Sequence, residues 1–280
     1  MNYRHAYHAG NEADCLKHAL LVLLLRALAR KPRPFFVLDT HAGVGAYDLG
    51  GVESAKTGEA RRGILALESL APPPAALADY LGLVRQLGLY PGSPALIRAL
   101  LRAGDRLACC ELHPEEHAAL KRRSAGDRQV QVHHRDGYEA LRGLLPPAER
   151  RGLVLIDPPF ERTDEFATLA AGIATATRRF PGAIVAAWYP VKLRPPVRTF
   201  LAALEALRIP DIVTAELLLR PPQDPARLNG SGLLVVNPPF RFEEAASAAL
   251  AALRERLAQP DGAAAVRRIT PERFMAEAAR

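Results

Sequence analysis

Short apolar runs alternate with longer amphipathic stretches along most of this chain. The apolar runs are four to eight residues long and are bounded by turn residues, which is the pattern of strands buried on both faces of a sheet. Seven such strands are expected, at residues 35–38, 107–110, 130–133, 153–156, 184–188, 212–219 and 233–236.

The stretches between these runs have helical periodicity. The clearest begins near Asn11, a good N-cap residue, and runs to about Arg30, with leucine at every fourth position and Pro32 just beyond its end. Strands that alternate with helices predict an α/β protein whose mostly parallel, seven-stranded sheet carries helices on both faces. Further helices are expected at residues 94–102, 114–123, 164–179 and 195–207.

The interval between the first and second predicted strands is too long for one helix. Residues 62–70 and 75–87 have helical patterns, and three consecutive prolines at 72–74 separate them. We therefore expect a small helical subdomain, residues 48–90, inserted into a main domain that comprises residues 1–47 and 91–280. The Ala/Arg-rich segment after about residue 259 gives no clear pattern.

Composition narrows the class of protein. Hydrophobic residues make up 49% of the chain and charged residues 24%, which is ordinary for a globular enzyme and argues against disorder. No run approaches the ~18 consecutive apolar residues that a membrane span needs, and the N-terminus does not lead into the apolar core of a signal peptide. The chain is expected to be soluble and cytoplasmic. Its net charge of +7 favours a polyanionic partner, although many basic proteins bind none.

The cysteines indicate neither a disulfide framework nor a metal site. Of the three, Cys109 and Cys110 are adjacent and lie in an apolar, strand-like run. A zinc site built from them and His113 would need a fourth ligand, and the spacing matches no zinc motif. Packing in the core is the preferred interpretation of both thiols, and no metal is expected.

A glycine turn follows the first predicted strand. Gly43 and Gly45 lie in the turn that follows this strand, after residues 39–42, at the edge where open parallel sheets bind nucleotide-like ligands. Asp48 stands where a dinucleotide-binding motif would have its third glycine, so the motif alone is weak. Glu111 ends the second strand, where a carboxylate binds ribose hydroxyls. A tight turn without a ligand is the alternative interpretation.

The run at residues 157–160 contains the residue types best suited to catalysis. The fourth strand delivers the carboxylate of Asp157, then Pro158, Pro159 and the ring of Phe160. The Asp157 carboxylate and the Pro158 carbonyl can accept hydrogen bonds from a planar amine such as that of adenine, whose nitrogen is otherwise a poor nucleophile. Phe160 offers a face on which an unstacked base can lie. These parts suit methyl transfer from S-adenosylmethionine, which carries an activated methyl group and needs no metal.

A nearly identical run at residues 237–240 tests this interpretation. Asn237, Pro238, Pro239 and Phe240 show that an Asx-Pro-Pro-Phe sequence can simply end a strand. Position separates the two runs, because Asp157 ends a strand expected near the centre of the sheet, whereas Asn237 ends the last strand predicted in the chain. We assign the chemistry to Asp157 and a structural role to Asn237.

Three further segments are candidates. In the N-terminal arm, Arg4 and Lys17 suit phosphates or a cofactor carboxylate, and Tyr3 or Tyr7 suits base stacking; a solvated basic arm is an equally good interpretation. Ser93 is expected to cap a helix whose N-terminus attracts a carboxylate. After the third strand, the pair Asp136 and Gly137 offers a side chain that could bind the adenine amine of a cofactor.

These motifs, in this order and spacing, resemble the bacterial large-subunit (23S) ribosomal RNA adenine-N6 methyltransferases of the RlmJ type. The resemblance extends to about residue 258. Two positions depart from the family pattern, since Phe160 stands where tyrosine is common and Glu12 interrupts an otherwise matching motif. The residues that carry the resemblance are Tyr3-Arg4-His5, His8-Ala9-Gly10-Asn11, Ala13-Asp14, Leu16-Lys17-His18, Leu38-Asp39-Thr40-His41-Ala42-Gly43, Thr57-Gly58-Glu59, Tyr90-Pro91-Gly92-Ser93-Pro94, Glu111-Leu112-His113-Pro114, Asp157-Pro158-Pro159-Phe160, Trp188-Tyr189-Pro190, Ser231-Gly232 and Asn237-Pro238-Pro239.

The resemblance implies a Rossmann-like class I methyltransferase fold with a helical subdomain inserted after the first strand. It implies that Asp157 is catalytic, that Tyr3 and His5 approach the target adenine of 23S ribosomal RNA, and that Lys17 lies close to the cofactor. It also implies a site for S-adenosylmethionine lined by His18, His41, Ser93, Glu111, Asp136, Gly137 and Asp157.

Three other functions are compatible with parts of the sequence. A DNA adenine-N6 methyltransferase would share the chemistry of residues 157–160, but it usually carries a larger region for reading duplex DNA. A protein-glutamine methyltransferase would fit an Asn-led motif better. A non-catalytic RNA-binding protein would have little use for Asp157, Glu111 and the glycine turn together. The chain is expected to act as a monomer.

Overall fold

A single eight-stranded sheet forms the centre of the protein. The computed structural model describes residues 5–272, apart from the side chains of residues 53 and 55. The strand order across the sheet is β10-β8-β9-β7-β6-β1-β4-β5. The strands are β1 (Phe36–Asp39), β4 (Arg106–Glu111), β5 (Val130–His134), β6 (Gly152–Ile156), β7 (Ala183–Val191), β8 (Ile212–Leu218), β9 (Gly230–Val236) and β10 (Ala263–Arg268).

All seven predicted strands are present, but the expected seven-stranded sheet is wrong because β10 adds an eighth. Five strands, β7, β6, β1, β4 and β5, run parallel to one another. Strand β9 is antiparallel to both β7 and β8, and β10 is antiparallel to β8. Strand β10 was not predicted because its sequence, Ala-Ala-Ala-Val-Arg-Arg, lacks a strand pattern and its strand conformation depends on pairing with β8.

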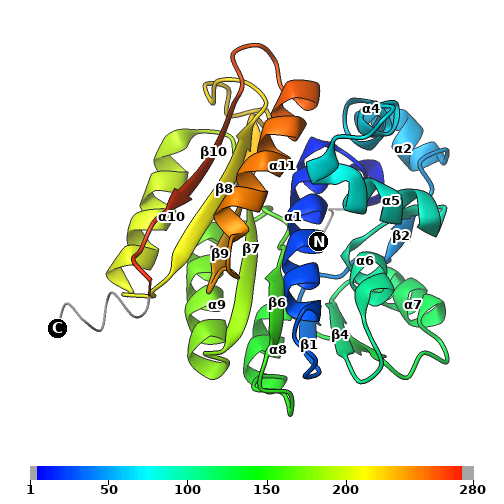
Figure 1. Ribbon diagram of the computed structural model, residues 1–280, viewed down its shortest axis with the longest axis vertical. Coiled ribbons are helices and arrows are strands. Elements are labelled where there is room, and N and C mark those ends of the chain that lie inside the picture. The colour runs from blue at the N-terminus through cyan, green and yellow to red at the C-terminus, as the bar shows by residue number, and fades with distance from the viewer. Residues whose placement is uncertain (1–4, 273–280) are drawn as a thin grey trace.

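Helices cover both faces of the sheet (Figure 1). Helices α1, α6 and α11 lie on the near face in this view, and α8, α9 and α10 lie on the other. The Asn11 side chain caps α1 by accepting a hydrogen bond from the Asp14 amide at 2.9 Å, as the sequence predicted. The helices of the main domain are α1 (Glu12–Ala29), α6 (Ser93–Leu100), α7 (Pro114–Arg123), α8 (Gly137–Gly143), α9 (Glu165–Arg179), α10 (Arg194–Ala206) and α11 (Phe242–Leu257), and a 3-10 turn, η1, spans His5–Tyr7.

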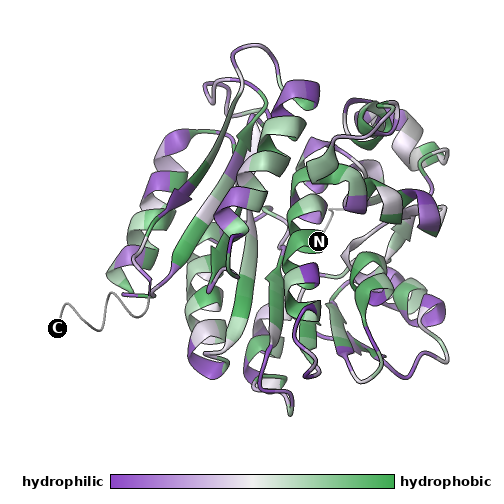
Figure 2. Ribbon diagram, viewed as in Figure 1, coloured by the Kyte–Doolittle hydropathy of each residue, from purple (hydrophilic) through white to green (hydrophobic). Residues whose placement is uncertain are grey.

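The sheet separates two hydrophobic clusters. Val37, on β1, packs into the cluster beneath α1, and its neighbour Leu38 packs into the cluster on the opposite face, because successive side chains of a strand point to opposite faces. Figure 2 shows the central strands and α1 as largely hydrophobic. Helix α1 is buried on most of its surface, since it packs between α11, α6 and the sheet. None of the described helices is both long and apolar enough to cross a membrane.

Short helices occupy the interval between β1 and β4. Strands β2 (Ala46–Tyr47) and β3 (Tyr90–Pro91) lie at the two ends of this segment and pair with each other in antiparallel orientation. The predicted helix at 62–70 is broken at Gly63, where a Cβ would meet the Gly10 carbonyl oxygen at 2.0 Å. The boundaries of a 48–90 subdomain stay a prediction. The helices here are α2 (Val52–Thr57), α3 (Glu59–Arg62), α4 (Ile64–Glu68), the 3-10 turn η2 (Ala75–Leu77) and α5 (Ala78–Leu87).

Candidate active site

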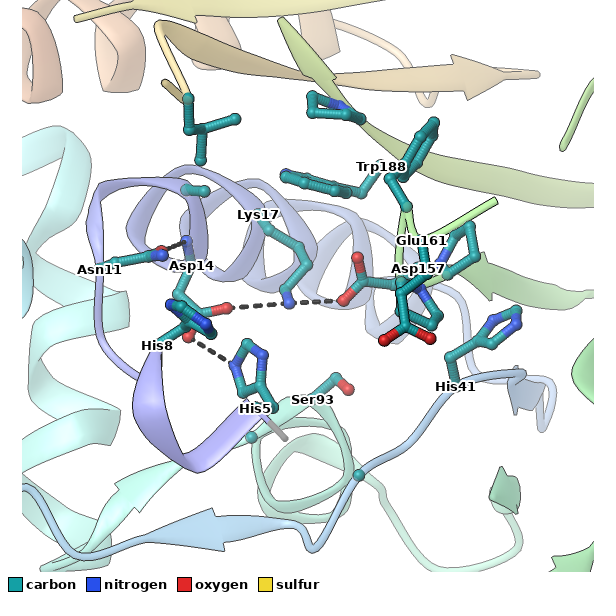
Figure 3. A pocket seen from close by; sticks show the side chains of 18 of the residues that line it. His5, His8, Asn11, Asp14, Lys17, His41, Ser93, Asp157, Glu161 and Trp188 are labelled. Carbon is teal, nitrogen blue, oxygen red and sulfur yellow. Dashed lines mark hydrogen bonds and ion pairs between the residues drawn. The ribbon is translucent and has the colours of Figure 1, made fainter. Parts of the chain in front are cut away.

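A cavity of about 910 Å³ opens at the carboxyl ends of the central parallel strands (Figure 3). This is the edge at which open α/β sheets hold their ligands. Of the candidate residues expected from the sequence, Tyr3 and Arg4 lie outside the described residues. Tyr7 and Gly45 are described but are not among the residues that line the cavity. The structure places the others in the lining of the cavity: His5, Lys17, His18, His41, Gly43, Ser93, Glu111, Asp136, Gly137, Asp157, Pro158 and Phe160.

Asp157 is paired with a buried lysine. The Nζ atom of Lys17 lies 2.5 Å from Oδ2 of Asp157 and 2.9 Å from Oδ1 of Asp14 (Figure 3). The side chains of Lys17 and Asp157 are only 7% and 15% exposed. Burial opposes the charge on Lys17, but the two carboxylates outweigh it and raise its pKa above the ordinary value. The ammonium is therefore charged, and it holds one oxygen of Asp157.

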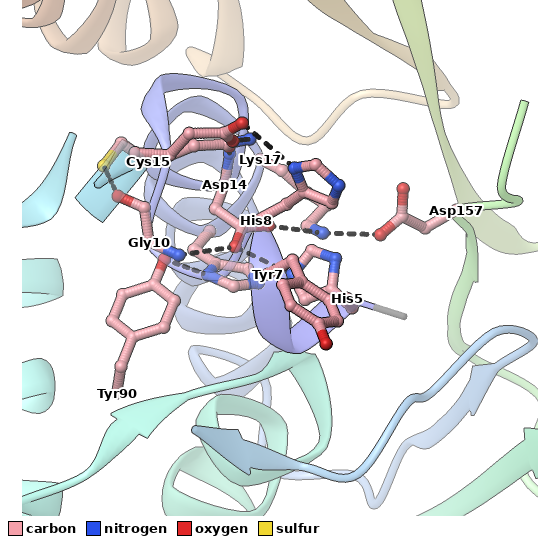
Figure 4. Close-up of polar contacts among 12 residues, drawn as sticks. His5, Tyr7, His8, Gly10, Asp14, Cys15, Lys17, Tyr90 and Asp157 are labelled. Atoms are coloured by element: carbon pink, nitrogen blue, oxygen red, sulfur yellow. Dashed lines mark hydrogen bonds and ion pairs between the residues drawn. The ribbon is translucent and has the colours of Figure 1, made fainter. Parts of the chain in front are cut away.

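Asp14 links this pair to the N-terminal segment (Figure 4). Its Oδ2 atom lies 2.9 Å from His5 Nε2 and accepts a hydrogen bond from the Gly10 amide, also at 2.9 Å. The Asp14 side chain is 2% exposed; although burial alone would raise its pKa, the charges of His5 and Lys17 hold it well below the usual range. Asp14 had no predicted role. The spacing of Asp14 and Lys17, one helical turn apart, was the available signal.

The glycine turn and the end of β4 are tied together by one carboxylate. Oε2 of Glu111 accepts from the Gly43 amide at 2.8 Å, and Oε1 accepts from the His113 amide at 2.7 Å. Gly43 has φ +62°, and a Cβ there would meet the Tyr47 hydroxyl at 2.5 Å, so the turn requires glycine. The two backbone amides fix the orientation of the Glu111 carboxylate in the cavity wall, and each oxygen keeps a lone pair for a ligand hydroxyl.

Ser93 is not the helix cap that the sequence predicted. The N-cap of α6 is Gly92, and Ser93 is the first helical residue. Its hydroxyl donates instead to Oδ2 of Asp39 at 2.7 Å. Asp39 is fully buried, and its Oδ1 has no hydrogen-bond partner within the described part of the chain. Burial raises the pKa of Asp39 to about 7, against the opposing effect of the Ser93 hydrogen bond. Asp39 is among the residues that carry the family resemblance, but the sequence indicated no function for it.

The first turn of α8 packs closely against the end of β1. Asp136 caps this helix, since its Oδ1 accepts from the amides of Tyr138 and Glu139 at 2.8 and 3.0 Å. At Gly137 a Cβ would meet the Thr40 carbonyl oxygen at 2.2 Å, so close packing explains this glycine. The capping role leaves the second oxygen of Asp136 available to a ligand.

Two histidines in the cavity wall are neutral. Burial lowers the pKa of His18 to about 3 and that of His41 to about 4. His18 Nδ1 lies 2.9 Å from the hydroxyl of Tyr90. The histidines therefore add no positive charge to that of Lys17 at neutral pH.

An aromatic cluster lines the side of the cavity next to Asp157. The ring of Phe160 makes edge-to-face contacts with Phe166 and Trp188, at centroid distances of 4.9 and 5.8 Å. Trp188 is half-buried and lines the cavity (Figure 3). Sequence reasoning noted Trp188 but gave it no function. Its place on β7, which pairs with β6 in parallel, brings it beside the strand end that carries Asp157.

The second Asx-Pro-Pro-Phe run lies elsewhere. It follows β9, which is antiparallel to β7, so it is at the opposite edge of the sheet from the cavity. Asn237 has φ +53°, and its Nδ2 donates to the carbonyl oxygens of Pro181 and Ala183 at 3.1 and 2.7 Å. The prediction that Asn237 ends the last strand of the chain is wrong, because β10 follows. Antiparallel pairing is what separates this run from Asp157.

The thiols and carboxylates of the described chain form no metal cluster. Across residues 5–272 there is no group of three His, Cys, Asp or Glu side chains with the geometry to hold a metal ion. Cys109 and Cys110 are buried in β4. Burial raises the pKa of both thiols.

Comparison with known proteins identifies the family. The family model described as "Ribosomal RNA large subunit methyltransferase D, RlmJ" matches residues 32–270. Two proteins named ribosomal RNA large subunit methyltransferase J, from Escherichia coli K12 and Haemophilus influenzae Rd, are each 40% identical to this chain, over 97% of it and 100% of each relative. The crystal structure of protein LPL1258 from Legionella pneumophila superposes with a TM-score of 0.86 and 34% identity, covering 93% of this chain and 98% of that one. The chain therefore belongs to the RlmJ family of ribosomal RNA large subunit methyltransferases.

Proposed function

We propose that this protein transfers a methyl group from S-adenosylmethionine to the exocyclic N6 amine of an adenine in 23S ribosomal RNA. The observation that carries the proposal is the position of Asp157, Pro158 and Phe160 in one cavity with Glu111 and Gly43. A polarising carboxylate and an aromatic ring thus lie next to features suited to a nucleoside cofactor. Family membership supports ribosomal RNA as the substrate.

The cavity residues fit a nucleoside cofactor. A volume of about 910 Å³ is at the upper end for small-molecule sites, which leaves space for a second group such as a base. Glu111 is oriented to bind ribose hydroxyls, Asp136 to bind an adenine amine, and the backbone at Gly43 permits close approach. Lys17, His18, His41, Ser93 and Gly137 complete this wall. When bound, S-adenosylmethionine supplies an electrophilic methyl group.

Asp157 and Pro158 act on the target amine. The N–H groups of the amine donate to the free Oδ1 of Asp157 and to the Pro158 carbonyl, which favours a nitrogen with an available lone pair. As the new N–C bond formed, the methyl–sulfur bond of the cofactor would break and leave a neutral thioether, while the carboxylate would stabilise the positive charge that develops on the nitrogen. Its proton is then acidic enough to pass to Oδ1.

Lys17 and the arm residues hold these groups in place. Lys17 binds Oδ2 of Asp157 and so orients the carboxylate, with Oδ1 left to accept from the amine. Phe160 supports the ring of the extruded adenine. His5, anchored by Asp14, lies on the opposite wall, from which it approaches the base. We further propose that the chain acts as a monomer, because residues of one copy line the whole cavity; light scattering tests this.

A transfer assay with four substrate pools tests the function. The protein is incubated with S-adenosylmethionine labelled in the methyl group and, separately, with ribosomal RNA, transfer RNA, duplex DNA and protein. We expect label in 23S ribosomal RNA, and N6-methyladenosine after digestion to nucleosides. Asp157→Asn should lower the transfer rate by about 10² to 10³-fold. Label in DNA alone would favour an adenine methyltransferase acting on DNA, and label in another nucleoside would refute the assignment of the N6 amine.

A further inference from the structure

The loop between β8 and β9, residues 219–229, forms one rim of the cavity. Figure 1 shows it in yellow at the top of the view. Arg220 and Arg227 of this loop line the cavity, and so does Lys192, which follows β7. Lys192 and Arg227 are exposed, so they lie at the mouth rather than in the interior. We refer to Lys192, Arg220 and Arg227 as the basic rim.

Most of the positive charge of the basic rim is not neutralised by the protein. Within residues 5–272, no carboxylate pairs with the Lys192 ammonium, and the Arg220 guanidinium donates only to the Leu228 carbonyl, at 3.2 Å. The buried Nε of Arg220 has no partner in this part of the chain. Asp224 is the only acidic residue of the loop, and it lies 3.3 Å from Arg227 in an exposed pair. An exposed pair of this kind is weak and yields readily to a competing anion.

Hydrogen bonds of Asn229 and three prolines restrict the conformation of the loop that carries the rim. The side chain of Asn229 is fully buried and donates to the carbonyl oxygens of Lys192 and Asp224, both at 2.7 Å. The Asn229 amide also donates to the carbonyl of Val191. Prolines occupy three positions of the loop, 221, 222 and 225, and restrict its backbone. A loop ordered before it binds has less conformational entropy to lose on binding.

The register of β6 and β7 sets the distance between Lys192 of the basic rim and Asp157. Strands β6 and β7 are parallel, and Ile156 pairs with Ala187, so Asp157 is level with Trp188. Lys192 lies four residues further along the chain, which at the rise of an extended strand is ~13 Å. That is too far to touch the base held at Asp157, and it suits the sugar-phosphate backbone on either side of that base.

From these observations we propose that the basic rim binds phosphates of the RNA strand flanking the target adenine. The inference rests on the proposed function and adds to it the path of the strand. Guanidinium and ammonium groups are the usual phosphate contacts in nucleic-acid complexes, and such contacts set the register of the strand without reading sequence. The rim would then keep the nucleotide next to the Asp157 cavity while its base is extruded.

The double variant Lys192→Gln/Arg227→Gln tests the rim. Both side chains are exposed, and Arg220 is left in place because it supports Leu228. We expect the KM for an unmodified 23S ribosomal RNA transcript to rise by about 10- to 30-fold. The affinity for S-adenosylmethionine and kcat at saturating RNA should stay within about twofold, because phosphate contacts position the strand without touching the reacting atoms.

A binding measurement without cofactor gives a second readout. Filter binding of the same transcript at several salt concentrations gives the slope of log affinity against log salt. The magnitude of this slope should be smaller by about 1.4 for the variant, since each phosphate contact to a single strand contributes about 0.7 to it and two contacts are lost. The matched control is Arg123→Gln/Arg178→Gln, which removes the same charge from exposed residues at the ends of α7 and α9, at the far edge of the sheet. Its KM and salt dependence should equal those of the unmodified protein.

The outcomes separate the inference from the function on which it rests. An unchanged KM and salt slope for the rim variant, with the unmodified protein active on the transcript, would overturn the basic rim alone. Equal changes in KM and in the salt slope for the control variant would also overturn the basic rim, since the net charge of the protein, rather than the position of the residues, would then explain the effect. Failure of the unmodified protein to methylate any RNA would overturn the proposed function and the rim together.

Discussion

Lys17 and Asp157, 140 residues apart in the chain, are in contact, with Nζ 2.5 Å from Oδ2. The contact joins α1 to the end of β6, so the N-terminal helix takes part in the site that the fourth predicted strand delivers. The second partner of Lys17 is Asp14, which also holds His5. One buried cation between two carboxylates thus couples the arm, the helix and the proposed catalytic group.

Removing the charge of Asp14 tests this coupling. In Asp14→Asn, the buried Lys17 keeps only Asp157, and His5 loses its charged partner, so we expect a stability loss of about 3 kcal/mol and slower methyl transfer. The matched control is Asp79→Asn, which breaks the exposed pair with Arg26 and should cost under about 1 kcal/mol. Urea unfolding and single-turnover kinetics measure the two effects. Equal, small losses in both variants would mean that the Asp14 network contributes no more than a surface pair.

Local patterns predicted the elements of this protein well, and contacts between distant segments less well. All seven predicted strands and the cap at Asn11 could be inferred because periodicity and capping are properties of neighbouring residues. Strand β10 could not, since its strand conformation depends on pairing with β8. The hydroxyl of Ser93 was assigned to a cap, but it bonds to Asp39, 54 residues away, and no sequence pattern encodes that partner.

The same limit applies to the site. Asp157, Glu111 and Gly43 were identified because each ends or follows a strand, and parallel strand ends meet at one edge. Asp14 and Trp188 were given no function because their importance arises from neighbours that the fold supplies. The two Asx-Pro-Pro-Phe runs are separated by the direction of β9, which the sequence alone did not reveal.

The buried neutral histidines predict acid sensitivity. In the folded protein the pKa of His18 is about 3 and that of His41 about 4, whereas in the unfolded chain both titrate near the ordinary value of 6.5. Between about pH 6.5 and 4 the unfolded chain binds protons that the folded chain does not, so stability decreases as the pH falls through this window. We expect a loss of about 2 to 3 kcal/mol per histidine between about pH 7 and pH 4.5.

Unfolding of His18→Gln at several pH values measures the contribution of this residue. The free energy of unfolding of the variant should differ less between neutral and acidic pH than that of the unmodified protein. The same substitution at the exposed His134 is the control and should keep the full difference. Parallel curves for His18→Gln and the unmodified protein would show that the acid loss originates in other groups.

Glu111→Gln should weaken cofactor binding specifically. The two carboxylate oxygens accept from the amides of Gly43 and His113, and glutamine can satisfy only one of them. Its amide N–H₂ would face a backbone N–H, so the turn should shift and the affinity for S-adenosylmethionine should fall by about tenfold or more. Calorimetry with the cofactor measures this fall, and filter binding should give an unchanged affinity for RNA. Glu149→Gln, which removes a carboxylate from the Arg106 pair, is the control, and a similar loss there would contradict a local effect.

Gly137→Ala tests the close approach of α8 to β1. An added Cβ would lie 2.2 Å from the Thr40 carbonyl oxygen, which is backbone and cannot rotate away, so the start of α8 must move. We expect a stability loss of about 1 to 3 kcal/mol, together with weaker cofactor binding because Asp136 moves with the helix. Gly82→Ala is the matched change, since Gly82 lies within α5 with nothing near its added Cβ, and it should instead stabilise the protein by up to about 1 kcal/mol. Opposite signs for the two substitutions would establish that the space at Gly137, rather than glycine flexibility, sets its role; two stabilising changes would remove the packing constraint between α8 and β1.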